Sequence, residues 1–274
     1  MRNFRISLLA IAVLLMTVSC EDKDAVKPAE KMHDQNDPLL NTALTYFDKE
    51  VNGASIEVAK VKDGYIVDGD IFMTEEQLSE YVNHMSGDVK TESNLGAYAW
   101  SNRTVYYVFA SNFAYRSAMQ QAMNIISSQT GARFVQGTGS GSYIYIFTEG
   151  NNVNYSQIGQ VGGQQRLSLG RNSVGVAIHE LGHAMGLLHE HQRPDRDSYI
   201  YVSPQVAWRP NFNKGGYSYG QFDFQSIMIY PSRNMGNGYD MVRRSNNMPF
   251  NSNVETGPFR YSSGDIAGLR AVGW

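Results

Sequence analysis

Residues 179–197 read HELGHAMGLLHEHQRPDRD, and this stretch decides which fold and which site to expect. It opens with His-Glu-x-x-His, so that His179 and His183 are four residues apart. On an α-helix, residues i and i+4 lie on one face, and both imidazoles can therefore bind one ion. Zinc accepts neutral imidazole ligands and activates water, and Glu180 beside the first ligand can take a proton from that water. The pentapeptide predicts a zinc site with Glu180 as general base.

His189 is the third candidate ligand. Gly186 comes three residues after His183, and His189 comes three residues after Gly186. Glycine adopts backbone turns that other residues resist, so that the helix can end near Gly186 and the chain can return His189 to the ion. A structural zinc site would more often use cysteines and close all four positions. The spacing therefore favours an open, catalytic zinc site.

The composition excludes several classes of protein. The chain has 274 residues and a formal net charge of −3, so it lacks the basic field that nucleic-acid binding requires, and we expect no nucleic-acid partner. A single cysteine excludes an internal disulfide framework. The 12% of aromatic residues and the modest 18% of charged residues argue for a folded chain.

The segment from His179 to Asp197 resembles the signature of the astacin family of metzincin metallopeptidases. The match includes the three histidines, Glu180 and Gly186, and it continues through Glu190, Arg193, Asp195, Arg196 and Asp197. Ser226–Tyr230 resembles the family's Met-turn, with Ile229 where histidine is common. The resemblance covers nearly all of residues 97–274. It implies an α+β fold: a metzincin-like two-subdomain catalytic domain, with an N-terminal twisted sheet carrying two helices and an irregular C-terminal subdomain.

The resemblance also implies roles for single residues. Met228 would form a hydrophobic floor beneath one catalytic Zn²⁺, held by His179, His183 and His189. Tyr230 would bind zinc in the resting enzyme and then help to stabilise the transition state. Glu190 would link to the buried N-terminus of the processed chain. Tyr143–Phe147 and then Gly159–Ser168 resemble the run that includes the family's substrate-binding edge strand.

Local patterns predict two modules. In residues 39–90 we expect a weak helix over Leu39–Val51, a strand over Ile56–Lys62 and a helix that opens at a capping box, Thr74–Gln77, and runs to Met85. Ser86–Asn94 is polar and is interpreted as a linker. In residues 91–274 we expect strands over Thr104–Phe109, Tyr143–Phe147 and Leu167–Leu169, and helices over Ala114–Gln129, Val174–Leu188 and Asp265–Ala271, with Ser173 and Ser262 or Ser263 as N-caps.

The first module has a candidate inhibitory motif. Val67–Ile71 reads VDGDI, which is similar to the Phe-x-Gly-Asp motif of astacin propeptides with Val67 in place of Phe. The resemblance implies that Asp70 binds the zinc of the zymogen. Asp-Gly-Asp is also a common hairpin turn, and this alternative stays open.

The N-terminus carries the features of an export signal. Arg2 and Arg5 precede an apolar run over Ile6–Val18 that is too short to span a membrane, and small residues lead to Cys20. Residues 1–20 are interpreted as a lipoprotein signal peptide, with Cys20 as the lipid-anchored residue, and residues 21–38 as a flexible tether. An ordinary signal peptide is the alternative. The lipoprotein signal predicts a protein anchored to the bacterial cell envelope, and the ordinary signal predicts a secreted protein.

Taken together, these features predict a zinc endopeptidase that acts on proteins or peptides and is made as a zymogen with an aspartate switch, released by an activating protease that cuts within Ser86–Gly96. Two other functions stay open: a non-catalytic envelope lipoprotein that binds its partner through this fold, and a zinc amidase that acts on cell-wall material. Arg193 and Arg209 are candidates for recognising an acidic substrate side chain, although Arg193 can instead pair with Asp195 or Asp197.

Overall fold

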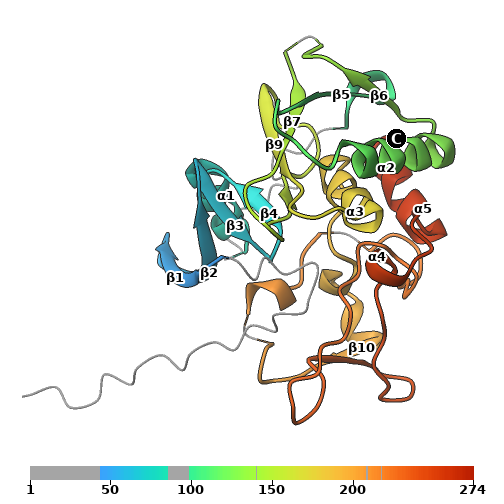
Figure 1. Cartoon of the computed structure of the whole chain (residues 1–274). Helices are drawn as coiled ribbons and strands as arrows, with labels where there is room; N and C mark the ends of the chain where they lie inside the picture. Colours follow the sequence, from blue (N-terminus) through green and yellow to red (C-terminus); the bar gives the residue numbers. More distant parts are fainter. Residues whose placement is uncertain (1–43, 86–98, 140, 208, 217) are drawn as a thin grey trace, which may run out of the picture. The chain divides into compact units, whose positions relative to one another are not determined.

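The computed structural model describes residues 44–85, 99–139, 141–207, 209–216 and 218–274 (Figure 1). All of them belong to one of the two compact units into which the chain divides, Asp34–Trp274. The predicted signal peptide with Cys20, the tether, the linker over Ser86–Asn94 and the cutting site within Ser86–Gly96 lie outside the described residues. None of the helices in the described ranges combines the length and the apolar character needed to cross a membrane.

A nine-stranded sheet runs through this unit in the order β1-β2-β3-β4-β8-β9-β7-β5-β6. Strands β1 to β4 pair antiparallel, β4 joins β8 in parallel, β8 pairs antiparallel with β9, and β9, β7, β5 and β6 pair in parallel. The strand bounds are β1 Tyr46–Val51, β2 Ala54–Val61, β3 Gly64–Val67, β4 Ile71–Met73, β5 Thr104–Phe109, β6 Arg133–Gln136, β7 Tyr143–Phe147, β8 Tyr155–Ser156 and β9 Gln164–Ser168.

The first module contributes β1 to β4 and helix α1, Glu75–Met85. The helix predicted over Leu39–Val51 is wrong where the structure describes it, because Tyr46–Val51 is strand β1. Asn52 and Gly53 have φ of 50° and 80°, the left-handed turn that joins two strands of a tight hairpin. The predicted capping box is confirmed: the backbone N–H of Thr74 donates to Gln77 Oε1 (3.0 Å), and that of Gln77 donates to Thr74 Oγ1 (3.2 Å).

Helices α2 (Arg116–Thr130) and α3 (Val174–Ala184) pack side by side against the parallel part of the sheet (Figure 1). Their buried faces share one hydrophobic core with β5, β7 and β9. The predicted strands and helices of this region are confirmed, with ends shifted by a few residues. Ser173 caps α3 as predicted, since its Oγ accepts from the backbone N–H of Val176 at 3.3 Å.

Helix α3 ends four residues before the predicted Leu188. Gly186 has φ +106°, and the backbone N–H groups of Gly186 and Leu187 donate to the carbonyls of His183 (2.8 Å) and Gly182 (2.9 Å). This Schellman motif ends the helix and satisfies two of its terminal carbonyls. Two tryptophans from opposite ends of the module 91–274 complete the cap. Trp100 Nε1 donates to Ala184 O at 2.8 Å, and Trp274 Nε1 donates to Met185 O at 2.7 Å.

The chain after α3 is mostly irregular, as its composition predicts. Its short elements are η2 Glu190–Gln192, η3 Arg196–Ser198, β10 Ile200–Val202, η4 Pro210–Phe212, β11 Met241–Arg243, α4 Asn253–Thr256 and α5 Ser263–Ala271. One further short helix, η1 Ser101–Arg103, precedes β5.

Helix α5 opens with a capping box between Ser262 and Asp265. Asp265 also accepts hydrogen bonds from Ser226 Oγ (2.6 Å) and the backbone N–H of Ile227 (3.1 Å), so that α5 holds the 226–230 segment in place.

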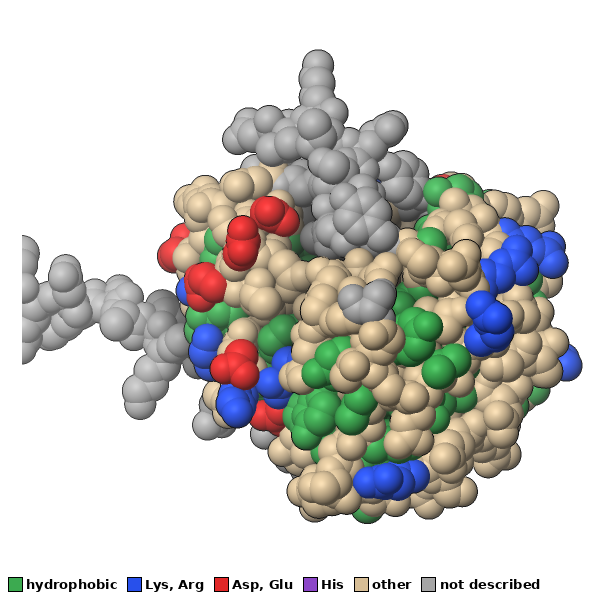
Figure 2. Space-filling model, turned by 90° about the horizontal axis from the view of Figure 1, so that it is seen from above, with side chains coloured by type: hydrophobic (Ala, Val, Ile, Leu, Met, Phe, Trp, Pro, Cys, Tyr) green, Lys and Arg blue, Asp and Glu red, His purple; other side chains and the backbone are tan. Residues whose placement is uncertain are grey.

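The α+β fold is confirmed, with a regular sheet-and-helix half followed by an irregular half. Figure 2 shows one face of the unit, on which the acidic side chains gather at the side that carries β1 to β4 and α1 in Figure 1. No histidine of the described residues is visible on this face. His179 and His183 on α3 and His189 and His191 after it are buried.

Candidate metal centre

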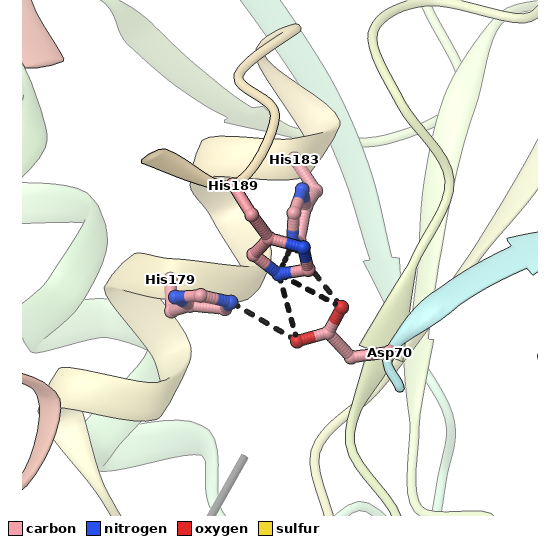
Figure 3. Close-up of side chains that lie close together, drawn as sticks. All are labelled: Asp70, His179, His183 and His189. Atoms are coloured by element: carbon pink, nitrogen blue, oxygen red, sulfur yellow. Dashed lines mark hydrogen bonds and ion pairs between the residues drawn. The ribbon is translucent and has the colours of Figure 1, made fainter. Parts of the chain in front are cut away.

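Helix α3 and the turn that follows it bring three imidazoles together (Figure 3). His179 and His183 project from one face of α3, and the Gly186 turn returns His189 to the same point. The Nε2 atoms of His183 and His189 are 3.2 Å apart, and Asp70 from the first module faces all three rings. One donor atom from each of these four buried residues lies within 4.8 Å of the others.

Each ring is held by a hydrogen bond at its other nitrogen. His179 Nδ1 donates to Ile227 O (2.8 Å), His183 Nδ1 to Leu187 O (2.8 Å) and His189 Nδ1 to Gln192 Oε1 (3.0 Å). These bonds place the proton on Nδ1 and leave the Nε2 lone pair directed into the site. Three converging lone pairs repel one another unless a cation lies among them. The donor set therefore fits zinc, which prefers imidazole nitrogen and carboxylate oxygen.

The charges in the pocket agree with this fit. Although burial by itself raises the pKa of the Asp70 carboxyl, His189 and His183 hold it well below its usual range. Burial lowers the pKa of His183 to about 4, which keeps this ring neutral. Burial also opposes a charged His189, but Asp70 outweighs it and raises the pKa of that ring. The ionised Asp70 thus favours a cation at the point between its carboxylate and the three rings.

Asp70 reaches the histidines from a strained loop. Asp68 and Gly69, which precede it, have φ of +51° and +92°. A Cβ on Gly69 would lie 2.5 Å from the Tyr230 hydroxyl oxygen, so only glycine fits here. Asp70 Oδ2 lies 3.1 Å from His179 Nε2, and Oδ1 lies 3.1 Å from His189 Nε2 and 3.4 Å from His183 Nε2. The Tyr230 hydroxyl lies 3.0 Å from both Asp70 Oδ2 and the Asp68 carbonyl oxygen.

Glu180 is the buried carboxyl next to the first histidine. Its side chain is fully buried, and neither of its oxygens has a hydrogen-bond partner among the described residues. Burial, and then the negative charge of Asp70, raises its pKa well above the usual range. An unpaired buried carboxyl is costly unless it serves a ligand or a reaction, and Glu180 is therefore a candidate proton acceptor.

Met228 lies directly beneath α3. A Cβ at Gly182 would be 2.6 Å from Met228 Sδ, so the absence of a side chain at Gly182 admits the thioether below the histidine-bearing turn. The backbone N–H of Glu190 donates to Met228 O at 3.1 Å, which ties the floor to the residue after the third histidine. Ile229 is fully buried beside it.

His191 lies two residues after the third histidine and contacts Tyr230. It is fully buried, and its ring stacks on Tyr230 at 4.6 Å. Its Nε2 donates to Asn211 O (3.0 Å), which leaves Nδ1 to accept from the backbone N–H of Tyr230 (3.4 Å). His191 therefore orients Tyr230.

Arg193 forms ion pairs with neighbouring carboxylates. Its guanidinium makes a two-bond ion pair with Asp195 (2.9 Å for each bond) and a third bond to Glu190 Oε1 (3.0 Å). The ion-pair interpretation is confirmed, with Asp195 as the partner, and Asp197 pairs with Arg196 instead.

Burial raises the pKa of Glu190 to about 7 against the opposing hydrogen bond from the backbone of Asp223.

Strand β8 is the strand next to the metal centre. It lies between Tyr143–Phe147 and Gly159–Ser168, the two segments that resemble the family's substrate-binding run. Strands β7 and β9 lie inside the sheet, and the short β8 between them in sequence pairs with β4 of the first module. Sequence reasoning also missed Gln192 and Asp68. Gln192 holds His189, and Tyr81 on α1 donates to Asp68 Oδ2 at 2.8 Å. The spacing of Gln192, three residues after His189, was the available signal.

Comparisons with known proteins bear on the larger part of the chain. The model of the family Astacin (Peptidase family M12A) matches residues 92–266. Nematocyst expressed protein 6 of Nematostella vectensis is 33% identical over 192 residues, which cover 65% of this chain and 66% of that protein. Flavastacin of Elizabethkingia meningoseptica is 30% identical over 249 residues, which cover 83% of this chain and 55% of flavastacin. The chain thus spans less than two thirds of the length of these two relatives.

A solved structure agrees with these relatives. High choriolytic enzyme 1, a hatching enzyme zinc-protease from Oryzias latipes, matches with a TM-score of 0.56 and 28% identity over 67% of this chain and 97% of that one. The likeness supports a shared architecture for the part that carries the three histidines.

We expect Gln192→Ala to weaken zinc binding, because it removes the acceptor that fixes the ring of His189. Loss of such an outer partner lowers metal affinity by about 10- to 100-fold. Titration of the full chain against a chromogenic zinc chelator measures the effect. Gln136→Ala, at an exposed position of β6, is the matched control and should bind zinc as the wild type does. Equal affinities for the two variants would contradict the assigned support.

Proposed function

The chain belongs to the astacin family of zinc metallopeptidases, and we propose that it hydrolyses peptide bonds and is made as a latent precursor. The proposal rests on the buried group of His179, His183 and His189. Glu180 is unpaired beside them among the described residues, and Asp70 offers a fourth ligand atom. Such a group is what a hydrolase with one catalytic zinc requires.

Two residues supply the proton transfers and the charge stabilisation. Zinc, when bound, polarises a substrate carbonyl and lowers the pKa of water to about 7. Glu180 takes the proton from the attacking water and then gives it to the nitrogen of the departing amine, so that the proton balance closes. The Tyr230 hydroxyl, once released from Asp70, donates a hydrogen bond to the carbonyl oxygen as negative charge develops on it. His191 holds the Tyr230 ring in place by stacking.

The substrate would pair with strand β8. The backbone N–H of Ser156 donates to the Asp70 carbonyl at 3.0 Å, and Ile71 is in register with Ser156. Main-chain pairing of this kind gives affinity to any extended peptide. When β4 is absent, the same edge is open to a protein or peptide substrate.

Latency would follow from the same contacts. Asp70 occupies the position that a water or a carbonyl needs, Tyr230 is bound to Asp70 and Asp68, and β4 covers the strand edge. We assign residues 39–90 to an inhibitory propeptide and residues 91–274 to the catalytic domain. An activating protease would cut within Ser86–Gly96 and release the Asp70 segment, and the new N-terminus would then link to Glu190.

Export and anchoring are the last part of the proposal. Residues 1–20 have the charge and hydropathy of a lipoprotein signal, and residues 21–38 have the composition of a tether. We assign the chain to the bacterial envelope, attached by lipid at Cys20, or to the secreted fraction if Cys20 is not modified.

Glu180→Gln and Tyr230→Phe should separate the two catalytic roles. We expect the first to lower kcat by about 10²- to 10⁴-fold and the second by about 10²- to 10³-fold, both with zinc retained and with little change in KM. Assays on a mixed peptide library after the full chain is cut in the linker measure this. Tyr201→Phe, which alters an exposed tyrosine of β10, is the control.

Turnover by Glu180→Gln at the wild-type rate would remove Glu180 from its role, and unchanged kcat in Tyr230→Phe would do the same for Tyr230. If the cut wild-type chain binds zinc and is silent on every peptide, a non-catalytic binding role or an amidase acting on cell-wall material replaces the proposal.

Asp70→Ala should activate the uncut chain. The change removes hydrogen bonds between charged groups worth about 1.5–3 kcal/mol, and the open state then becomes about 10- to 100-fold more populated. Peptide hydrolysis by the uncut variant, with gel analysis to show that it stays uncut, measures this. Asp48→Ala on the exposed side of β1 should stay latent. A silent Asp70→Ala that becomes active only after cutting would mean that β4 alone blocks the site.

Cys20→Ser should abolish lipid attachment. We expect the wild type, expressed in a bacterial host, to incorporate labelled palmitate and to sediment with membranes, and the variant to lose both properties. A variant that still sediments with membranes would show that another feature anchors the chain.

A further inference from the structure

We propose that Phe147, Tyr155 and Arg166 form a binding pocket for an aromatic side chain of the substrate, and that Phe72 of the propeptide fills it in the uncut chain. The inference rests on the proposed function, because it requires the propeptide to leave. It goes further by naming the side-chain class that the strand edge selects.

Phe72 lies in β4, two residues beyond Asp70, on the strand that covers β8. It is 3% exposed, and its ring stacks on Tyr155 with centroids 5.7 Å apart and planes at 22°. Gly64 on the neighbouring strand makes room for it, since a Cβ there would lie 2.6 Å from the Phe72 ring. Two residues beyond Asp70, this strand thus carries a buried aromatic ring.

Arg166 on β9 forms the second wall of the pocket. Its guanidinium carbon lies 4.6 Å from the Phe147 ring centroid and 5.4 Å from that of Phe72, so that the cation is close to both rings. Its NH2 group donates to Glu149 Oε2 (2.8 Å) and to the Tyr155 hydroxyl (3.0 Å). Its Nε is buried and has no hydrogen-bond partner among the described residues.

Departure of the propeptide would leave this wall in place and empty the position of Phe72. The apolar cluster on this side of the sheet takes Ala59, Val61, Ile66 and Phe72 from the propeptide, against Val153, Tyr155 and the half-buried Phe147 from the catalytic part. Removing the first group exposes two aromatic rings and a guanidinium beside a free strand edge. Exposed apolar groups gathered in this way mark binding sites.

The charges favour a ring over a carboxylate in the emptied position. Arg166 has two acidic partners: Asp63 at 3.3 Å, which leaves with the propeptide, and Glu149 at 2.8 Å, which stays. Glu149 continues to neutralise the guanidinium, so the pull on a substrate carboxylate is weak. The side of the guanidinium next to Phe72 becomes open and can contact another ring.

Binding to a chain that cannot turn over tests the pocket. The full chain with Glu180→Gln is loaded with zinc and cut in the linker, and gel filtration checks that the propeptide has left. Calorimetry then compares short blocked peptides that carry Phe, Leu or Asp at one position, moved stepwise along the peptide. We expect one position at which Phe binds about tenfold tighter than Leu, from stacking and the cation–ring contact.

Arg166→Gln in the same background should reduce the preference for Phe over Leu to less than about twofold. Phe147→Leu, a milder change, should also lower it and serves if the first variant fails to fold. Arg133→Gln, on β6 at the other end of the sheet order, should keep the tenfold preference. Equal binding of Phe and Leu at every position would overturn the pocket, as would tighter binding of Asp or an unchanged preference in Arg166→Gln.

Hydrolysis by the cut chain with Glu180 intact separates this inference from the proposed function. Cleavage of peptides with no binding preference for Phe would leave the peptidase proposal standing and refute the pocket. A preference for Phe in binding, with no cleavage of any peptide, would leave the pocket standing and refute the peptidase.

Discussion

Three imidazole nitrogens that direct their lone pairs at one buried point repel one another, and this constraint underlies the rest of the structure. The Nε2 atoms of His183 and His189 come within 3.2 Å, which is tolerable only when a cation, either a metal ion or a proton, lies between them. Contacts from the surrounding chain hold the three rings in this arrangement. Carbonyl and amide oxygens fix each Nδ1–H, and the thioether of Met228 supports the helix from below.

The first module contacts both this point and the sheet through a few consecutive residues. Asp70 brings a carboxylate to the point where the rings converge, and its backbone continues as β4 along the sheet. One short segment, Asp70–Phe72, therefore contacts the three histidines, strand β8 and Arg166. In the latent precursor that we propose, these contacts on consecutive residues would link latency to substrate preference, because one segment would block the histidines, the strand edge and the aromatic pocket together.

Local patterns predicted most of the elements and failed at identifiable points. The capping box at Thr74, an N-cap at Ser262 or Ser263 and the alternation in Thr104–Phe109 need only neighbouring residues. All three are confirmed, with Ser262 as the N-cap. The Asn52-Gly53 turn is also a local signal, and it was outweighed by a weak helical pattern. The end of α3 was placed too late, because a helical pattern continues in sequence beyond the residue where Gly186 ends the helix.

The sequence by itself determined the three histidines, Glu180 and the family, because their chemistry depends on spacings within a single helix and the turn after it. Only the tertiary structure decided which strand meets the site, how Asp70 reaches it, and which groups Gln192, His191 and Arg166 contact. These contacts join residues far apart in the chain, such as Asp70 and His189 or Phe72 and Tyr155. No local pattern encodes them, since they form only when the sheet aligns β4 with β8 and the core closes over α3.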